Sequence, residues 1–156
     1  MKRILVIDDD EIVNDMIVQL LTEAGYEAEG ALDGSRGLKL LDAKPFDLIV
    51  TDIVMPEKEG LETILAIRKQ SKTVPIIAIS GGGKTGPENY LHMAQRFGAD
   101  YIFQKPFESA FPEMNIYKMN IYAIEHIVGC SEYHYPFVRV TIASSEHRSE
   151  PTTLSG

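Results

Sequence analysis

Short apolar runs alternate with helix-forming segments along the first two thirds of this 156-residue chain. Ile4-Leu5-Val6-Ile7 is β-branched and apolar throughout, which is typical of a strand buried on both faces of a parallel sheet. Similar strands are expected at Leu48 to Val50, at Val74 to Ile79 and at Tyr101 to Gln104, with a weaker edge strand over Tyr26 to Ala31. Strands that alternate with helices through short loops are parallel and joined by right-handed crossovers. The pattern predicts a doubly wound α/β fold.

The segments between these runs have apolar residues spaced three and four apart, as on one face of a helix. The first helix is expected to end at Gly25 and to turn these residues inward: Ile12, Val13, Met16, Ile17, Leu20, Leu21 and Ala24. A second helix, around Leu38 to Leu41, stops before Pro45. The third buries Leu61, Ile64, Leu65 and Ile67, and the fourth runs from about Pro87 to Phe97.

Chemically useful side chains follow four of the five predicted strands. The first strand ends in Asp8-Asp9-Asp10, the third in Asp52, the fourth in Ser80 and the fifth in Lys105. One polar strand end needs no explanation beyond contact with water. Four together favour a site, because ligands of doubly wound sheets bind beyond the carboxyl ends of the strands.

Such a cluster supports phosphoryl chemistry. Carboxylates held close together repel one another, and Mg²⁺, which prefers a few carboxylates with water and phosphate oxygens, relieves that repulsion. A carboxylate also attacks phosphorus to give an aspartyl phosphate. Mg²⁺ and Lys105 would supply positive charge to the phosphoryl oxygens, and Ser80 would donate a hydrogen bond to one of them.

These residues carry a resemblance. The first strand with its aspartates, Asp52-Ile53-Val54-Met55-Pro56, Ser80 and Lys105-Pro106-Phe107 together resemble the receiver domain of bacterial two-component response regulators. The resemblance covers about residues 2 to 108. It implies a flavodoxin-like, five-stranded sheet in the order 2-1-3-4-5. It also implies Mg²⁺-dependent phosphotransfer from a histidine kinase or phosphotransfer protein to a single-domain, chemotaxis-regulator-like signalling module.

The resemblance also implies a role for each residue. Asp52 is the phosphoacceptor, Ser80 the switch hydroxyl and Lys105 the phosphoryl contact, with a cis bond before Pro106. The implied metal ligands are Asp8, Asp9, Asp52 and the backbone carbonyl of Val54. Asp10 is expected to stay in solvent and to bind no metal.

Three positions depart from the family's pattern. Ile102 occupies the usual place of the switch aromatic residue, three residues before Lys105, and the alternation of a strand turns Tyr101 and Phe103 to the opposite face. Val54 and Gly82 stand where other members carry side chains that orient a hydrolytic water. We therefore expect slow loss of the phosphoryl group.

Residues 1–108 are predicted to form the receiver core, 109–129 an atypical fifth helix and 130–156 a partly disordered tail. Pro112 interrupts the usual start of that helix, so it is expected to begin late. Its inward residues would be Met114, Tyr117, Ile121, Ile124 and Val128. A short coiled-coil surface is the alternative for the same spacing.

Composition narrows the remaining possibilities. A net charge of -8 argues against nucleic-acid binding, one cysteine suits a reduced cytoplasmic setting, and the apolar runs are too short for a membrane span. The main alternative to a non-enzymatic phosphoacceptor is a Mg²⁺-dependent phosphatase of the haloacid-dehalogenase type, with its Asp-x-Asp start at Asp8. No acidic pair follows Lys105, and Asp52 would have no role in such an enzyme.

Overall fold

Five parallel strands alternate with four helices in the part of the chain that the structure, a computed structural model, describes: residues 1–55, 59–81, 87–104 and 124. The strands are β1 (Arg3–Ile7), β2 (Glu27–Ala31), β3 (Leu48–Asp52), β4 (Ile76–Ser80) and β5 (Tyr101–Gln104). The helices are α1 (Glu11–Glu23), α2 (Gly34–Ala43), α3 (Glu59–Gln70) and α4 (Pro87–Phe97). The predicted bounds of β5 and the approximate bounds of α4 are confirmed.

The strands form one parallel sheet in the order β2-β1-β3-β4-β5. β1 pairs with β2 on one side and β3 on the other, in a register that sets Ile7 beside Thr51. β2 is an edge strand, as its partly polar sequence predicted. The doubly wound α/β fold and the sheet order implied by the resemblance are confirmed.

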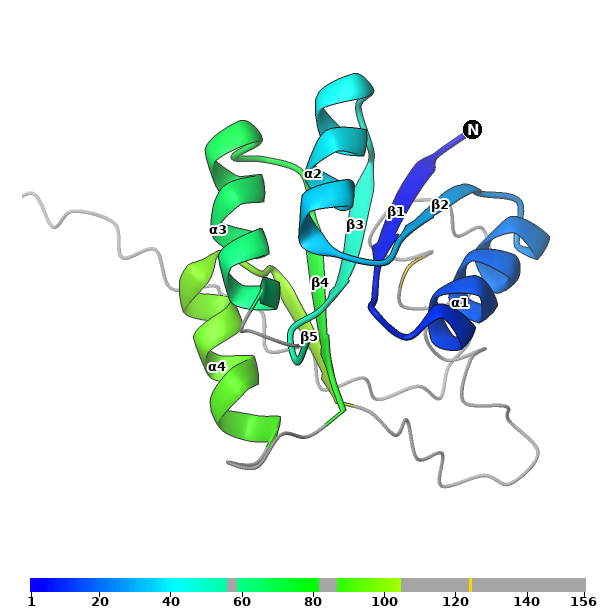
Figure 1. The fold of residues 1–156 in the computed structure, drawn as a ribbon. Coiled ribbons are helices and arrows are strands. Elements are labelled where there is room, and N and C mark those ends of the chain that lie inside the picture. Colours follow the sequence, from blue (N-terminus) through cyan, green and yellow to red (C-terminus); the bar gives the residue numbers. More distant parts are fainter. Residues whose placement is uncertain (56–58, 82–86, 105–123, 125–156) are drawn as a thin grey trace, which may run out of the picture.

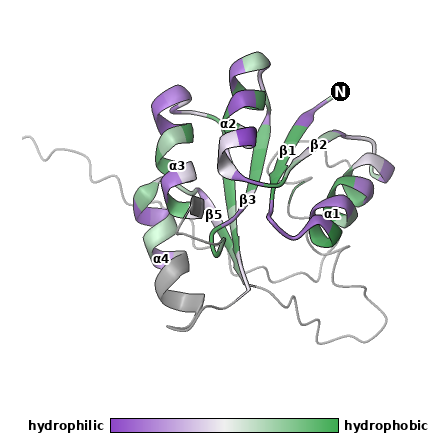
Figure 2. Cartoon of the chain, viewed as in Figure 1, coloured by the Kyte–Doolittle hydropathy of each residue, from purple (hydrophilic) through white to green (hydrophobic). Residues whose placement is uncertain are grey.

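Helices cover both faces of the sheet, with α2, α3 and α4 on one side and α1 on the other (Figure 1). A first core cluster lies under α2, α3 and α4 and includes Leu5, Ile49 and Ile64. A second cluster lies on the α1 face and includes Val6, Leu21 and Val50. Because β1 and β3 are buried on both faces, each contains a run of apolar residues, Ile4 to Ile7 and Leu48 to Val50, whereas the helices mix hydrophilic and hydrophobic residues (Figure 2).

Three predicted inward positions are wrong. Ile12, at the start of α1, is 79% exposed, Leu65 on α3 is 40% exposed, and Ala24, at the end of α1, is also exposed. The buried side chains of α1 include Asn14 and Leu21, and Ile17 and Val18 pack against the second core cluster. Those positions also follow a helical spacing. The helix is therefore rotated relative to the predicted face, and a polar residue takes an inward position.

The ends of α1 follow from local chemistry. The Asp10 carboxylate accepts hydrogen bonds from the backbone N–H groups of Ile12 and Val13, which makes it the N-cap. Ala24 is the C-cap, and Gly25 follows with φ +91°, a conformation that favours glycine. Asp33 caps α2 in the same way by accepting from the N–H of Arg36.

Ile124 is the one described residue beyond β5. It is helical, 4% exposed and part of the second core cluster, on the sheet face that α1 also covers. Its burial fits its predicted inward position, while the rest of the predicted fifth helix and the tail lie outside the described residues. None of the helices in the described ranges has the length and hydropathy of a membrane span.

Candidate functional site

The sheet register brings Asp8 and Asp52 to the same edge of the sheet. Ile7 lies opposite Thr51, so the next residues along the two neighbouring strands are Asp8 and Asp52. Asp52 is the last residue of β3, and Asp8 directly follows β1. Both side chains are buried, with 8% and 2% of the residue exposed.

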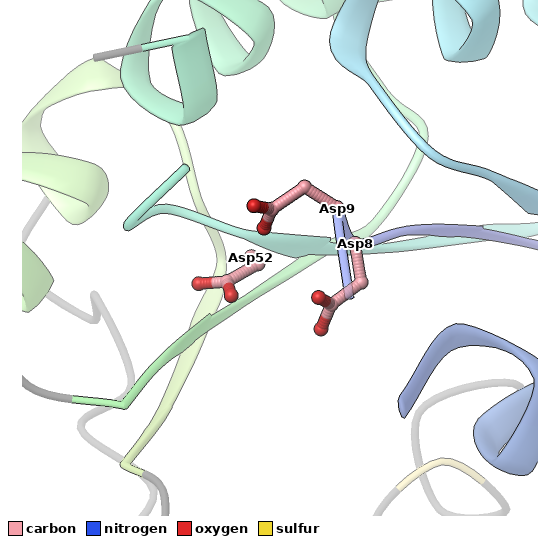
Figure 3. A group of neighbouring side chains, drawn as sticks. All are labelled: Asp8, Asp9 and Asp52. Carbon is pink, nitrogen blue, oxygen red and sulfur yellow. The ribbon is translucent and has the colours of Figure 1, made fainter. Parts of the chain in front are cut away.

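Asp9 completes a cluster of three carboxylates (Figure 3). Asp8, Asp9 and Asp52 each offer one carboxylate oxygen, and these oxygens all lie within 4.8 Å of one another. Asp9 is exposed, so the cluster opens to solvent on one side. All-oxygen donors at this spacing fit a small hard divalent cation that keeps several waters, which is the preference of Mg²⁺.

Backbone hydrogen bonds orient the two buried carboxylates. Oδ1 of Asp8 accepts from the N–H of Asp10 at 3.0 Å, and Oδ1 of Asp52 accepts from the N–H of Val54 at 3.0 Å. Each carboxylate therefore closes a turn with the residue two positions on. These bonds fix one oxygen of each group. They also partly compensate the cost of burying a charge.

The structure places some of the other predicted site residues near the cluster and leaves others undescribed. Ser80 is the last residue of β4 and is fully buried. Ile79, which precedes Ser80 in the sequence, lies beside Asp52 in the sheet. Val54 is half-buried and follows Asp52 by two positions. Asp10 caps α1 and does not belong to the carboxylate cluster. Gly82, Lys105 and Pro106 lie outside the described residues.

Ile102, which occupies the usual place of the family's switch aromatic residue, lies on the predicted face of β5. Ile102 packs against the first core cluster, whereas Tyr101 and Phe103 pack against the second, on the opposite face of the sheet. Each of the three is half-buried. The residue that faces the α3 and α4 side at this position is therefore aliphatic.

Sequence reasoning missed two residues that lie against the site. Asn14 is 2% exposed, and its side-chain nitrogen donates to the backbone oxygen of Asp8 at 3.2 Å. Gly60, at the start of α3, approaches the backbone of Asp52 and Ile53 so closely that a Cβ would lie 2.4–2.7 Å from three of its atoms. The helical spacing of Asn14 with Leu21 was a usable signal for the first. No local sequence pattern indicates the close approach of Gly60.

A cavity of about 420 Å³ lies between α2 and α3. Its lining includes Lys39 and Glu62, and it contains none of the three clustered carboxylates. The acidic cluster therefore lies at the edge of the sheet, outside this cavity.

Comparison with known proteins agrees with the geometry. Residues 4–111, more than two thirds of the chain, match the family described as "Response regulator receiver domain". The chain is 41% identical over 105 residues to the transcriptional regulatory protein YrkP of Bacillus subtilis, covering 67% of this chain and 43% of that protein. It is 35% identical over 107 residues to the transcriptional regulatory protein CpxR of Escherichia coli K12, covering 69% and 44%. The chain thus spans less than half the length of these curated relatives.

Solved structures give the same result for the fold. The chemotaxis protein CheY4 of Vibrio cholerae aligns with a TM-score of 0.67 and 29% identity, covering 81% of this chain and 98% of that one. A CheY-like receiver domain from Methanospirillum hungatei aligns with a TM-score of 0.68 and 27% identity, covering 83% and 96%. A haloacid-dehalogenase-type phosphatase is not favoured by these matches. By fold, by its clustered carboxylates and by the extent of the match, the chain belongs to the receiver-domain family of two-component response regulators.

Proposed function

We propose that this receiver domain accepts a phosphoryl group on Asp52 from a histidine kinase or phosphotransfer protein. The observation that carries the proposal is the cluster of Asp8, Asp9 and Asp52, whose carboxylate oxygens lie within 4.8 Å of one another at the end of β1 and β3. The N–H of Val54 holds one oxygen of this buried carboxylate in place, and a carboxylate is a group that can attack phosphorus.

The proposed step is a displacement at phosphorus. An oxygen of Asp52 attacks, the new O–P bond forms, and the P–N bond to the donor histidine breaks. The electron pair of that bond goes to the imidazole nitrogen, which leaves as a neutral ring once it carries a proton. The product is an aspartyl phosphate, so the domain assists its own modification without turning over a separate substrate.

The metal ligands in this proposal are Asp8, Asp9, Asp52 and the carbonyl oxygen of Val54. When bound, Mg²⁺ would neutralise charge on the phosphoryl oxygens during the attack by Asp52. Lys105 would pair with a phosphoryl oxygen, and Ser80 would donate a hydrogen bond to another. Ser80 lies at the end of β4, one strand away from Asp52, which suits that role.

The output is a changed surface read by a downstream protein, in the cytoplasm. The relatives YrkP and CpxR are named transcriptional regulatory proteins, and that description belongs to proteins more than twice as long as the matched region. For this chain we propose the phosphorylation-controlled part of such a system, with no nucleic acid or membrane contact by the receiver domain itself.

Site mapping with acetyl phosphate tests the proposal. Parent protein is treated with acetyl phosphate and Mg²⁺, reduced with borohydride and digested, and the modified peptide is identified by mass spectrometry. Asp52→Asn is expected to abolish the acid-stable, base-labile acyl phosphate, whereas Asp8→Asn only slows its formation. Modification of Asp8 in the parent, or the reverse ranking of the two variants, contradicts the proposal and fits the phosphatase alternative.

A further inference from the structure

Asn14 is a buried polar side chain that contacts the backbone just before the acidic cluster. Its Nδ2 lies 2.9 Å from the carbonyl oxygen of Ala31, 3.2 Å from that of Asp8 and 3.4 Å from that of Val6. An amide nitrogen carries two hydrogens, so three acceptors share two donors. With 2% of the residue exposed, these bonds are made almost without solvent.

The position of these acceptors matters because the sheet ends there. Ala31 is the last residue of β2, and its carbonyl oxygen also accepts from the N–H of Asp8 at 3.1 Å. Asp8 has just left β1, and the chain beyond Ala31 turns away into α2. The Asn14 amide supplies a donor to the carbonyl of Asp8 where the strand-to-strand pairing has ended. It therefore fastens the peptide bond between Asp8 and Asp9.

A second observation concerns β2. Gly30 lies beside Val6 in the sheet, and a Cβ on Gly30 would stand 2.0 Å from Oδ1 of Asn14 and 3.1 Å from its Cγ. Real Cβ atoms essentially never approach so closely, so an alanine there would displace the amide. Glycine in the middle of a strand costs stability. Here it provides the space that the Asn14 side chain occupies.

We infer that Asn14 is a positioning residue for the acidic pocket, and that Gly30 is the residue that makes room for it. This inference rests on the proposed function, since it concerns the same cluster of carboxylates. The three hydrogen bonds of the Asn14 amide nitrogen all go to backbone carbonyl oxygens. Asn14 acts through the backbone of Asp8, and so sets where the Asp8 and Asp9 side chains begin. Residues that orient metal ligands in this way typically contribute about 10–100-fold to metal affinity.

The test compares Mg²⁺ affinity and pocket geometry in Asn14→Ala, Asn14→Ser and Gly30→Ala. Leu21→Ala is the matched control, because Leu21 is buried on the same helix within the second core cluster and is remote from the Asp8 carbonyl bond. Mg²⁺ is titrated while the backbone amide signals of Asp8 and Asp9 are followed by NMR, and urea unfolding measures stability. We expect Kd to rise about 10-fold in Asn14→Ala and Gly30→Ala and less in Asn14→Ser, which keeps one donor. Leu21→Ala is expected to lose stability with Kd unchanged.

The double variant Asn14→Ala/Gly30→Ala separates positioning from simple damage. Removal of the amide also removes the atoms that a Cβ at Gly30 would strike, so Kd in the double variant is expected to match that of Asn14→Ala alone. A parent-like Kd in both Asn14→Ala and Gly30→Ala overturns the inference. An equal rise of Kd in Leu21→Ala also overturns it.

The amide signals keep this result separate from the proposed function. If the parent binds no Mg²⁺, the proposed function fails, and the Mg²⁺-free signals of Asp8 and Asp9 still decide the inference. They are expected to shift in Asn14→Ala and Gly30→Ala and to stay in place in Leu21→Ala. If the amide signals of Asp8 and Asp9 stay in place in both Asn14→Ala and Gly30→Ala, the inference about Asn14 is overturned.

Discussion

Asp9 and Asp52 bring carboxylate oxygens within 4.8 Å of each other, although Asp9 is exposed and Asp52 is buried. They come from segments more than forty residues apart in sequence and meet because β1 and β3 are neighbours in the sheet. The fold therefore holds like charges together, and a cation or a neutralising substitution relieves the repulsion.

Neutralising Asp9 is expected to separate stability from function. Asp9→Asn removes one of three clustered charges, so the Mg²⁺-free protein should gain up to about 1 kcal/mol of unfolding free energy. Phosphorylation by acetyl phosphate and stabilisation by Mg²⁺ should both be lost. Urea unfolding with and without Mg²⁺ measures the gain in stability and the loss of stabilisation by Mg²⁺. An Asp9→Asn protein that accepts phosphate at the parent rate contradicts the pocket assignment.

Val54 is expected to prolong the phosphorylated state. Its side chain offers no hydrogen-bond donor or acceptor to a water that attacks in line with Asp52, and positioning of that kind is worth up to about 10²-fold. Val54→Asn should therefore speed phosphate loss in Mg²⁺ buffer, whereas Val54→Ala should decay like the parent. The measurement is the time course of phosphate release, and equal rates for Val54→Asn and parent exclude this explanation.

The close approach of Gly60 to β3 is expected to make any side chain costly there. A Cβ would lie 2.4 Å from Cα of Ile53 and 2.6 Å from the carbonyl oxygen of Asp52, both backbone atoms that cannot rotate away. Gly60→Ala should cost about 1–3 kcal/mol of stability and slow phosphorylation, because the shift falls on Asp52 itself. Glu62→Ala, an exposed position in the same helix, is the control and should behave like the parent. Parent-like stability in Gly60→Ala would mean that α3 moves freely.

Arg68 fastens the end of the sheet opposite the site. Its guanidinium donates to the carbonyl oxygens of Gly98 and Val74 at 2.8 and 2.6 Å, and pairs with the Asp100 carboxylate at 2.7 Å. Lysine cannot reproduce this planar fork, so Arg68→Lys should lower unfolding free energy by about 1–3 kcal/mol. Mg²⁺ affinity should stay at the parent value, since these contacts lie at the start of β4 and β5. A changed Mg²⁺ affinity would show that the two ends are coupled.

Asp47 is expected to contribute to acid sensitivity. The backbone N–H of Arg3, at 2.8 Å, and the Lys2 ammonium, at 3.1 Å, hold the pKa of this carboxyl below its ordinary value of 3.8. A depressed folded-state pKa stabilises the fold above the unfolded pKa, and that contribution is lost as pH falls through the folded value. Asp47→Asn should thus be less stable than the parent at neutral pH, with the difference shrinking below about pH 4. Unfolding curves across this range test it, and a difference that grows on acidification contradicts it.

The sequence by itself determined the order of the elements and the residues at the strand ends. Alternating apolar runs and helical spacing are local properties, so the bounds of α4 and β5 and the edge position of β2 were readable from the chain. The aspartates of the cluster were also predictable, because they directly follow buried strands and parallel strands end at one edge of the sheet.

The tertiary structure decided which face of each helix turns inward and what may approach the site. Helical spacing gives the period of α1, but packing against the sheet sets its rotation, and that rotation buries Asn14 and exposes Ile12. The same is true of Gly30 and Gly60, whose missing side chains matter only because Asn14 and the backbone of Asp52 lie against them. Such contacts join residues distant in sequence, so no local pattern records them. They arise when strands and helices pack at close to van der Waals distance.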